Sequence, residues 1–428
     1  MAITKIEVPE LFDFGSDNSA FKLPTGTTAE RPTSPSNGEM RFNTTTGYVE
    51  YYDTTDAQWW EIDYAPDPFV PSDNFNTVLY QGNGSTQAVT GTAFTPDLVW
   101  VKGRSVATSN NLFDSIRGNQ RIISNSTGAQ VDLNPYAPDG LPSFNSNGFN
   151  IGDNFNGDYG LNGDPSGTYG SATGYVAWCW KAGGAPTATN SGGQTPTSGS
   201  KMVDGVASTA NFATSTSYPL RQSVNSSAGF SITTITKSAI NIPLEVPHGL
   251  NSPPELIMLK TTSTSDDWNQ WQTAIGTGAY LSTNRNGGND GATASSGYGF
   301  TVVNNDIIRN QWTGAIRTWV CYAWHSVEGY SKMGSYNGSN SPISIITGFR
   351  PAFLMVKRTN ATSNWLIIDS ARGAGSNAKA LYPNSSAAES DSWNTSFDSN
   401  GFTISSNEAW LSVSGGEYIF MAFAADPT

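Results

Sequence analysis

Residues Pro96-Asp97-Leu98-Val99-Trp100-Val101-Lys102 are one of three copies of a heptapeptide that indicates the fold class. Proline opens each copy, four or five apolar residues follow, and lysine closes it. A run this short and this apolar predicts a strand buried on both faces, with proline tolerated only at its first position. The other two copies are Pro254-Glu255-Leu256-Ile257-Met258-Leu259-Lys260 and Pro351-Ala352-Phe353-Leu354-Met355-Val356-Lys357.

A polar block follows each heptapeptide at the same distance after its lysine. In the first and third copies it is Asp-Ser-x-Arg-Gly, and in the second the small residues and the glycine stay while Asp and Arg are replaced. The three versions are Asp114-Ser115-Ile116-Arg117-Gly118, Gln272-Thr273-Ala274-Ile275-Gly276 and Asp369-Ser370-Ala371-Arg372-Gly373.

Two further blocks complete the repeat. A Ser-Asn-Gly sequence between apolar residues predicts a tight turn followed by a strand, at 144–151 and 397–404, with a shorter version at 298–302. Six-residue aromatic strands close the units at 175–180, 319–324 and 418–423. Four blocks in one order, three times over, indicate three copies of one β module.

The composition favours an all-β protein. The chain has 13 Trp, 17 Tyr and 20 Phe, which a disordered chain would not carry, and few runs of Lys, Glu or Leu that would favour long helices. The net charge of −13 and the lack of a basic run argue against nucleic acid as a partner. Two cysteines in apolar stretches predict core thiols, and neither a signal peptide nor a membrane helix is expected.

The predicted organisation is a small N-terminal β-hairpin adaptor followed by three tandem β-sandwich modules of jelly-roll or lectin-like type. The adaptor is 1–67 and ends at a hinge with two prolines. A Ser/Thr/Gly-rich stretch separates the first two modules, and its second half, with Tyr218 to Arg221, is a candidate extra strand of module two. The modules are 68–184, 230–330 and 331–428, and the linker is 185–229.

The N-terminal region carries a recognisable motif. It consists of Gly26-Thr27-Thr28-Ala29-Glu30-Arg31-Pro32, continued to Arg41-Phe42-Asn43-Thr44, and then Glu50-Tyr51-Tyr52 and Trp59. This resembles the GTTAxRPxxPxxGxxRFNT element of tailed-phage fibre and other virion proteins. The three repeats resemble a module family of marine bacteriophage structural proteins, with its PxLVWVK strand, DSxRG block, SNGF turn and YVAWxWKAGG ending.

The resemblance implies a function and a set of partners. We expect a virion structural protein, a tail fibre that is assembled in the host cytoplasm, attaches to other virion proteins through residues 1–67 and presents the modules to a host-surface glycan. A homotrimer is expected, since fibres of this type are usually trimeric and 67 residues bury a poor core alone. Two alternatives stay open: a capsid fibre, decoration or tail-assembly protein without receptor binding, and a glycan depolymerase.

Candidate ligand-binding residues fall into two groups, each with a structural alternative. Asp114 with Arg117, and Asp369 with Arg372, are either short ion pairs that clamp a loop or part of a sugar-binding rim. Tryptophans outside the repeated strands are either platforms for a sugar face or covers of a sandwich core. These are Trp365 and Trp393, with Trp268, Trp271, Trp312 and Trp410 as further candidates.

Catalysis and metal binding have little support in the sequence. The loop from Asp153 to Gly160, with Asp164 beyond it, offers oxygen ligands for Ca²⁺, but Phe155 interrupts the EF-hand pattern and a solvated loop is the preferred interpretation. His248 and His325 are the only histidines, and no GxSxG motif accompanies them. We therefore expect no enzyme activity, no cofactor, no metal site and no membrane insertion.

Overall fold

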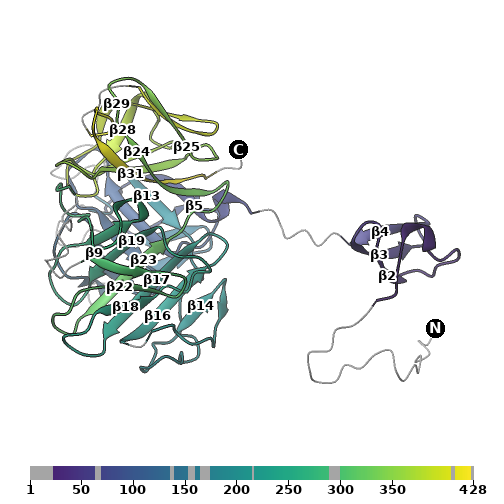
Figure 1. Ribbon diagram of the computed structural model, residues 1–428. Coiled ribbons are helices and arrows are strands. Elements are labelled where there is room, and N and C mark those ends of the chain that lie inside the picture. Colours follow the sequence, from purple (N-terminus) through teal and green to yellow (C-terminus); the bar gives the residue numbers. More distant parts are fainter. Residues whose placement is uncertain are drawn as a thin grey trace. The chain divides into compact units, whose positions relative to one another are not determined.

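The computed structural model describes residues 23–62, 69–134, 139–152, 160–163, 174–214, 216–288, 299–405 and 410–425. Within these residues every regular element is a β-strand or a short 3-10 helix, so the predicted all-β class is confirmed. None of the described helices is long and apolar enough to cross a membrane. The chain divides into two units, Met1–Phe69 and Val70–Thr428, and Figure 1 labels some of the strands of each.

The N-terminal unit is a small four-stranded sheet in the order β1-β2-β3-β4. One face of this sheet carries buried polar side chains of the sequence motif, which surround the fully buried Glu50. The Arg31 guanidinium lies 2.5 Å from the Glu50 carboxylate, Arg41 lies 3.4 Å from it, and Asn43 Nδ2 donates to it at 3.0 Å. The elements are β1 (Thr25–Gly26), η1 (Thr28–Glu30), β2 (Met40–Asn43), β3 (Tyr48–Asp53) and β4 (Gln58–Ile62).

Copy one of the repeat forms two facing sheets, of order β10-β9-β8-β7-β13-β5 and β11-β12-β6. The 3-10 helix η2 (Pro71–Asp73) leads into the first strand. The strands are β5 (Phe75–Gln81), β6 (Gln87–Thr90), β7 (Leu98–Gly103), β8 (Asn111–Asp114), β9 (Gly118–Ile123), β10 (Val131–Asp132), β11 (Ser143–Asn145), β12 (Gly148–Ile151) and β13 (Gly174–Trp180).

Copy two repeats this plan with sheets β15-β14-β16-β17-β23-β19-β20 and β18-β22-β21. Its strands are β17 (Phe230–Lys237), β18 (Leu244–Pro247), β19 (Leu256–Thr261), β20 (Asn269–Gln272), β21 (Phe300–Val303), β22 (Ile307–Asn310) and β23 (Thr318–Trp324), with η5 (Thr273–Ile275) after β20. The SNGF equivalent of this copy differs from the expected 298–302. Because β22 pairs with β18 as β12 pairs with β6, the corresponding turn is Asn304 to Asp306.

The stretch 185–229 is folded onto copy two. It contains β14 (Lys201–Val203), β15 (Val206–Ala207) and β16 (Ser217–Asn225), and β16 pairs antiparallel with β17. Its first half, expected to be flexible, is bound to β16 because the backbone NH of Asn190 donates to Leu220 O at 2.8 Å and its Nδ2 donates to Pro219 O at 3.0 Å.

Copy three places all of its strands in one sheet, in the order β24-β31-β26-β27-β28-β29-β30-β25. This sheet continues from the layer equivalent to β5-β13-β7-β8 into the layer equivalent to β11-β12-β6, so one sheet supplies both layers. The strands are β24 (Ser331–Asn337), β25 (Ile343–Ile346), β26 (Phe353–Arg358), β27 (Leu366–Asp369), β28 (Gly375–Leu381), β29 (Ser390–Asp398), β30 (Gly401–Ile404) and β31 (Glu417–Phe423).

The closing strands explain how the three copies are assembled. In β13, Tyr175, Ala177 and Cys179 point into the core of copy one, whereas Val176, Trp178 and Trp180 point into a second core. The same alternation holds in β23 and β31 and in the heptapeptide strands β7, β19 and β26. The second core is shared by all three copies, and each copy also has a core of its own.

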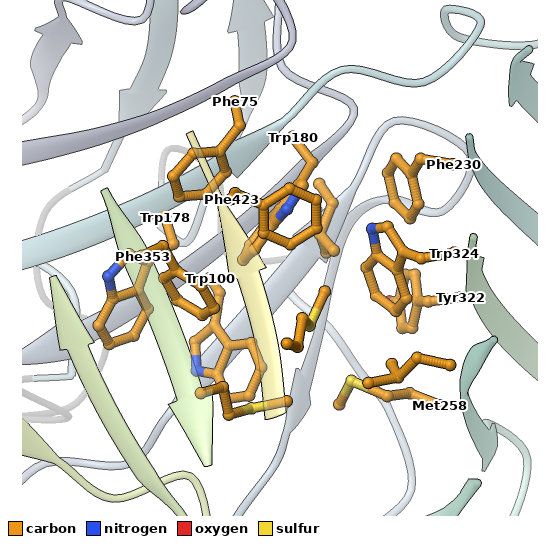
Figure 2. Close-up of a cluster of buried hydrophobic side chains, with 14 of the residues drawn as sticks. Phe75, Trp100, Trp178, Trp180, Phe230, Met258, Tyr322, Trp324, Phe353 and Phe423 are labelled. Carbon is orange, nitrogen blue, oxygen red and sulfur yellow. The ribbon is translucent and has the colours of Figure 1, made fainter. Parts of the chain in front are cut away.

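Aromatic side chains dominate the shared core. Figure 2 shows Trp180, Trp324 and Phe423, one from each copy, gathered in a single cluster. The Trp180 ring centroid lies 6.3 Å from that of Trp324, 5.6 Å from Phe353 and 5.8 Å from Phe423. One tryptophan of copy one therefore contacts both other copies, and the three modules form one assembly around a common core.

We expect Trp180→Ala to destabilise all three copies together. Truncating a buried tryptophan costs about 3–5 kcal/mol, and here the lost contacts belong to three modules. Hydrogen exchange should accelerate in β13, β23 and β31.

Phe149→Ala is the matched control, because Phe149 is fully buried in the separate core of copy one. Its effect should stay within copy one. If Trp180→Ala also accelerated hydrogen exchange in copy one alone, the result would contradict a shared core.

Candidate functional site

The Asp114–Arg117 pair lies inside the assembly, at the junction of copies one and two. Arg117 Nε donates to Asp114 Oδ2 at 2.6 Å, and the Arg117 backbone NH donates to Oδ1 at 2.9 Å. The hydroxyl of Tyr322, from the closing strand of copy two, donates to Asp114 Oδ2 at 2.7 Å and accepts from Arg117 at 3.1 Å. Arg117 also donates to Gln120 O and Gln130 Oε1.

The Asp369–Arg372 pair repeats this geometry at the junction of copies three and one. Arg372 Nε donates to Asp369 Oδ2 at 2.6 Å, and the indole NH of Trp178 donates to the same oxygen at 2.9 Å. The Arg372 guanidinium lies 5.5 Å from the Trp178 ring centroid. Glu389 binds both Arg372, at 3.3 Å, and Arg104 of copy one, at 2.9 Å.

The third junction, between copies three and two, has no such pair. Register makes Met421 the equivalent of Trp178 and Tyr322, because all three face the heptapeptide strand at the same position. Met421 offers no hydrogen-bond donor, and the equivalents of Asp and Arg are Gln272 and Ile275. Gln272 Nε2 instead donates to Gly334 O of copy three at 3.0 Å. At this junction the aspartate that accepts and the aromatic side chain that donates to it are therefore both replaced.

These positions correct the sugar-rim hypothesis for the four charged residues. Asp114 and Asp369 are fully buried, and Arg117 and Arg372 are 9% and 5% exposed. The short ion pair of the clamp interpretation is present in both copies, and each pair also binds an aromatic side chain of another module. Their role is to join modules, since a ligand in solution cannot reach them.

Sequence reasoning assigned no role to the lysine that closes each heptapeptide. Lys102, Lys260 and Lys357 are fully buried. Each ammonium donates to a carbonyl of a neighbouring copy: Lys102 to Ser386 O at 3.0 Å, Lys260 to Thr127 O at 2.8 Å and Lys357 to Asn286 O at 3.3 Å. Copy one binds copy three, three binds two, and two binds one, so the hydrogen bonds close a ring. The recurrence of a lysine at the end of each apolar heptapeptide was the sequence feature that could have indicated this role.

Two of the candidate tryptophans belong to the same ring. Trp268 Nε1 donates to Ile123 O of copy one at 2.9 Å, and Trp365 Nε1 donates to Ser282 O of copy two at 3.1 Å. Both indoles are buried, so they are not platforms for a ligand. At the same place in copy one, Asn110 donates to Tyr382 O at 3.0 Å.

The remaining candidate tryptophans lie over the cores of single modules. Trp271 is buried and donates to Gly276 O, while Trp312 is half-buried beside Trp319. Trp393 and Trp410 are half-buried and stack with centroids 5.5 Å apart on the core of copy three. Trp393 therefore keeps a partly accessible ring, with its NH donated to Ser390 Oγ at 2.9 Å.

His248 and the two cysteines are buried outside the junctions. His248 is buried, and its Nδ1 accepts from Leu250 N while its Nε2 lies 2.9 Å from Asn304 O. Burial lowers the pKa of His248 to about 4, so the ring is neutral at pH 7. Cys179 and Cys321 are buried free thiols whose pKa is raised by burial.

The acidic loop proposed for Ca²⁺ lies mostly outside the described residues, including Asp153, Asp158 and Asp164. Among the residues that the structure does describe, no group of three or more His, Cys, Asp or Glu side chains is arranged to hold a metal ion.

Comparison with known proteins identifies a family. Residues 70–214 and 202–427 each match the family described as a domain of unknown function, DUF7483. The two matches together span nearly the whole repeat region, so the chain belongs to this family. No curated protein and no solved structure matches the chain.

Asp114→Ala should destabilise the protein by about 3–5 kcal/mol, because it leaves the buried Arg117 guanidinium without its counter-ion. Chemical denaturation followed by tryptophan fluorescence measures this loss.

A triple variant provides the matched comparison. Asp114→Gln, Arg117→Ile and Tyr322→Met together copy the chemistry of the junction between copies two and three. We expect the triple variant to be more stable than Asp114→Ala, because no buried charge is left without a counter-ion. A triple variant that is less stable than the single one would contradict the proposed equivalence of the junctions.

A second prediction concerns the pH dependence of stability. Burial, with the nearby Arg372 charge as a smaller cause, lowers the pKa of Lys102 to about 7. The unfolded chain keeps this proton to about pH 10, so between pH 7 and 9 the unfolded state binds more protons and the free energy of unfolding rises with pH, by at most about 1.4 kcal/mol per unit. Lys102→Met should reduce this rise, most clearly between pH 7 and 8, because burial also lowers the pKa of Lys260, to about 8, and Lys260 adds to the rise above that pH. Parallel stability curves for the two proteins from pH 7 to 9 would show that Lys102 does not titrate there.

Proposed function

We propose that this chain, as a member of the DUF7483 family, is a tail fibre of a tailed bacteriophage. In this proposal the unit Met1–Phe69 attaches to other virion proteins and the unit Val70–Thr428 is a head that binds a glycan of the host surface. The observation that carries the proposal is the division of the chain into a small sheet with the virion-type motif and a large head with one shared core. Attachment and recognition then belong to different units.

The N-terminal sheet has the properties of an attachment surface. Register puts Met40, Tyr51 and Trp60 side by side on one face, with Phe42, Val49 and Ile62 beside them. Met40, Trp60 and Ile62 are 43%, 43% and 38% exposed, a large share for apolar side chains. An apolar face on so small a sheet gains stability when a protein partner covers it. The opposite face is fixed by the motif residues around Glu50.

The head suits a binding role at the far end of an appendage. It carries a low density of charge and many turns, and its modules are fixed by buried junctions. The proposed homotrimer would form through Met1–Phe69, because the head already completes a ring of three modules within one chain. Three chains would then present nine modules.

Cryo-electron microscopy of the intact particle tests this proposal. We expect density for the chain at the tail, three chains per fibre, with residues 1–67 against the tail machinery and the modules outward. Density distributed over the capsid lattice would overturn the tail-fibre proposal in favour of a capsid fibre or decoration protein. Release of reducing ends from host glycan by the purified chain would favour a depolymerase.

A further inference from the structure

We propose that a groove between copies two and three binds a neutral sugar residue of the glycan, an inference that rests on the proposed function. The groove has a volume of about 380 Å³, within the range of small-molecule sites. Its lining comes from η5, from the edge strand β24, from the residue after β26 and from the start of β31. The residues that matter here are Ile275, Ser335, Asn337, Thr359, Glu417 and Ile419.

The groove lies at the junction whose arginine position holds an uncharged residue, Ile275. At the equivalent place, Arg117 fills the junction of copies one and two, and Arg372 fills that of copies three and one. Copy two has Ile275 at this position, a shorter and uncharged side chain. The other two junctions are also occupied by neighbouring charged groups, Arg221 donating to Ile116 O and Arg104 binding Glu389. The third junction stays open.

The same junction has a carboxylate at the first position of its closing strand, where the other two copies have none. Register makes Glu417 the equivalent of Gly174 in copy one and of Thr318 in copy two. The Glu417 side chain is exposed, and no ion pair or hydrogen bond to its carboxylate is seen among the described residues, while its backbone NH donates to Asn360 Oδ1 at 3.2 Å. This junction therefore has no arginine at the position of Arg117 and Arg372, and it has a carboxylate, Glu417, that is not held by a protein partner among the described residues.

The lining matches the chemistry of a sugar. Most of the groove lining is polar, and the half-buried Ile275 provides an apolar contact for the C–H face of a pyranose ring. Asn337 and Ser335 share a face of β24 and provide donors and acceptors, while the Glu417 carboxylate can accept from two neighbouring hydroxyls. Thr359 Oγ1 donates to Glu417 O at 3.2 Å and keeps lone pairs for a ligand hydroxyl. The unpaired carboxylate repels acidic sugars, so a neutral residue is preferred.

Variants of the full chain test the groove. Binding of a panel of neutral mono- and disaccharides is measured by saturation-transfer NMR and calorimetry, and binding to host cells is measured in parallel. We expect Glu417→Ala and Asn337→Ala each to weaken sugar binding about tenfold or more, since each removes hydrogen bonds to the ligand. Ile275→Arg should abolish binding, because it restores the guanidinium of the other copies and pairs it with Glu417.

Gln81→Ala is the matched control. Gln81 is exposed and takes the position of Asn337 in copy one, and its replacement should leave sugar binding unchanged. Thermal unfolding of each variant checks that the head is intact. Glu417→Ala changes only an exposed side chain, so the test does not depend on the folding of Ile275→Arg.

The outcomes separate this inference from the proposed function. Cell binding with no binding of any panel sugar, or sugar binding that survives Glu417→Ala and Ile275→Arg, overturns the groove and leaves the fibre proposal standing. Sugar binding that the groove variants abolish, in a chain that binds no host cells, supports the groove and overturns the host-attachment role. Loss of both kinds of binding in the groove variants supports both.

Discussion

Burial of both faces of the three closing strands is the constraint on which the rest of this structure depends. In a strand such as β13 every residue from Tyr175 to Trp180 has a mainly apolar side chain, so one sandwich can bury only half of them. The remaining half, with Trp178 and Trp180, needs a second apolar surface, and the corresponding faces of β23 and β31 provide it. The modules therefore assemble around a common aromatic core, and their polar junctions form at the edges of that core.

Around this core, substitutions in one copy are matched by substitutions in its neighbours. Trp100 in copy one takes the place of Met258 and Met355, and copy one has Asn110 where the other copies have Trp268 and Trp365. Each copy therefore has one indole at this pair of positions. In copy one it comes from the heptapeptide strand, and in copies two and three it comes from the residue before the next strand. In copy one, Trp100 Nε1 donates to Asn110 Oδ1 at 3.2 Å. The junctions follow the same logic, because Asp–Arg pairs occur where the neighbour offers a donor and Gln272 with Ile275 occurs where it offers Met421.

Local pattern was sufficient to predict the all-β class, the repeat and the double burial of the heptapeptide strands, since these depend on residues close in sequence. Local pattern could not show which part of the molecule covers the second face of these strands. The partner of Arg117 is Tyr322, 205 residues away, and a short Asp-x-x-Arg sequence has the same appearance at a surface and at a junction. Trp365 was likewise ambiguous, because a single tryptophan covers a core edge or an interface equally well. The groove arises from residues of two copies and has no sequence signature.

Fusion of three modules in one polypeptide fixes their stoichiometry and makes the three junctions independent of one another. In a symmetric trimer of identical subunits, every amino-acid replacement would appear three times around the axis, and a change that opened one junction would open all three. Here Ile275 and Glu417 alter one junction while Arg117 and Arg372 continue to hold the other two. A difference between the copies can therefore be confined to one junction while the other two keep their buried ion pairs.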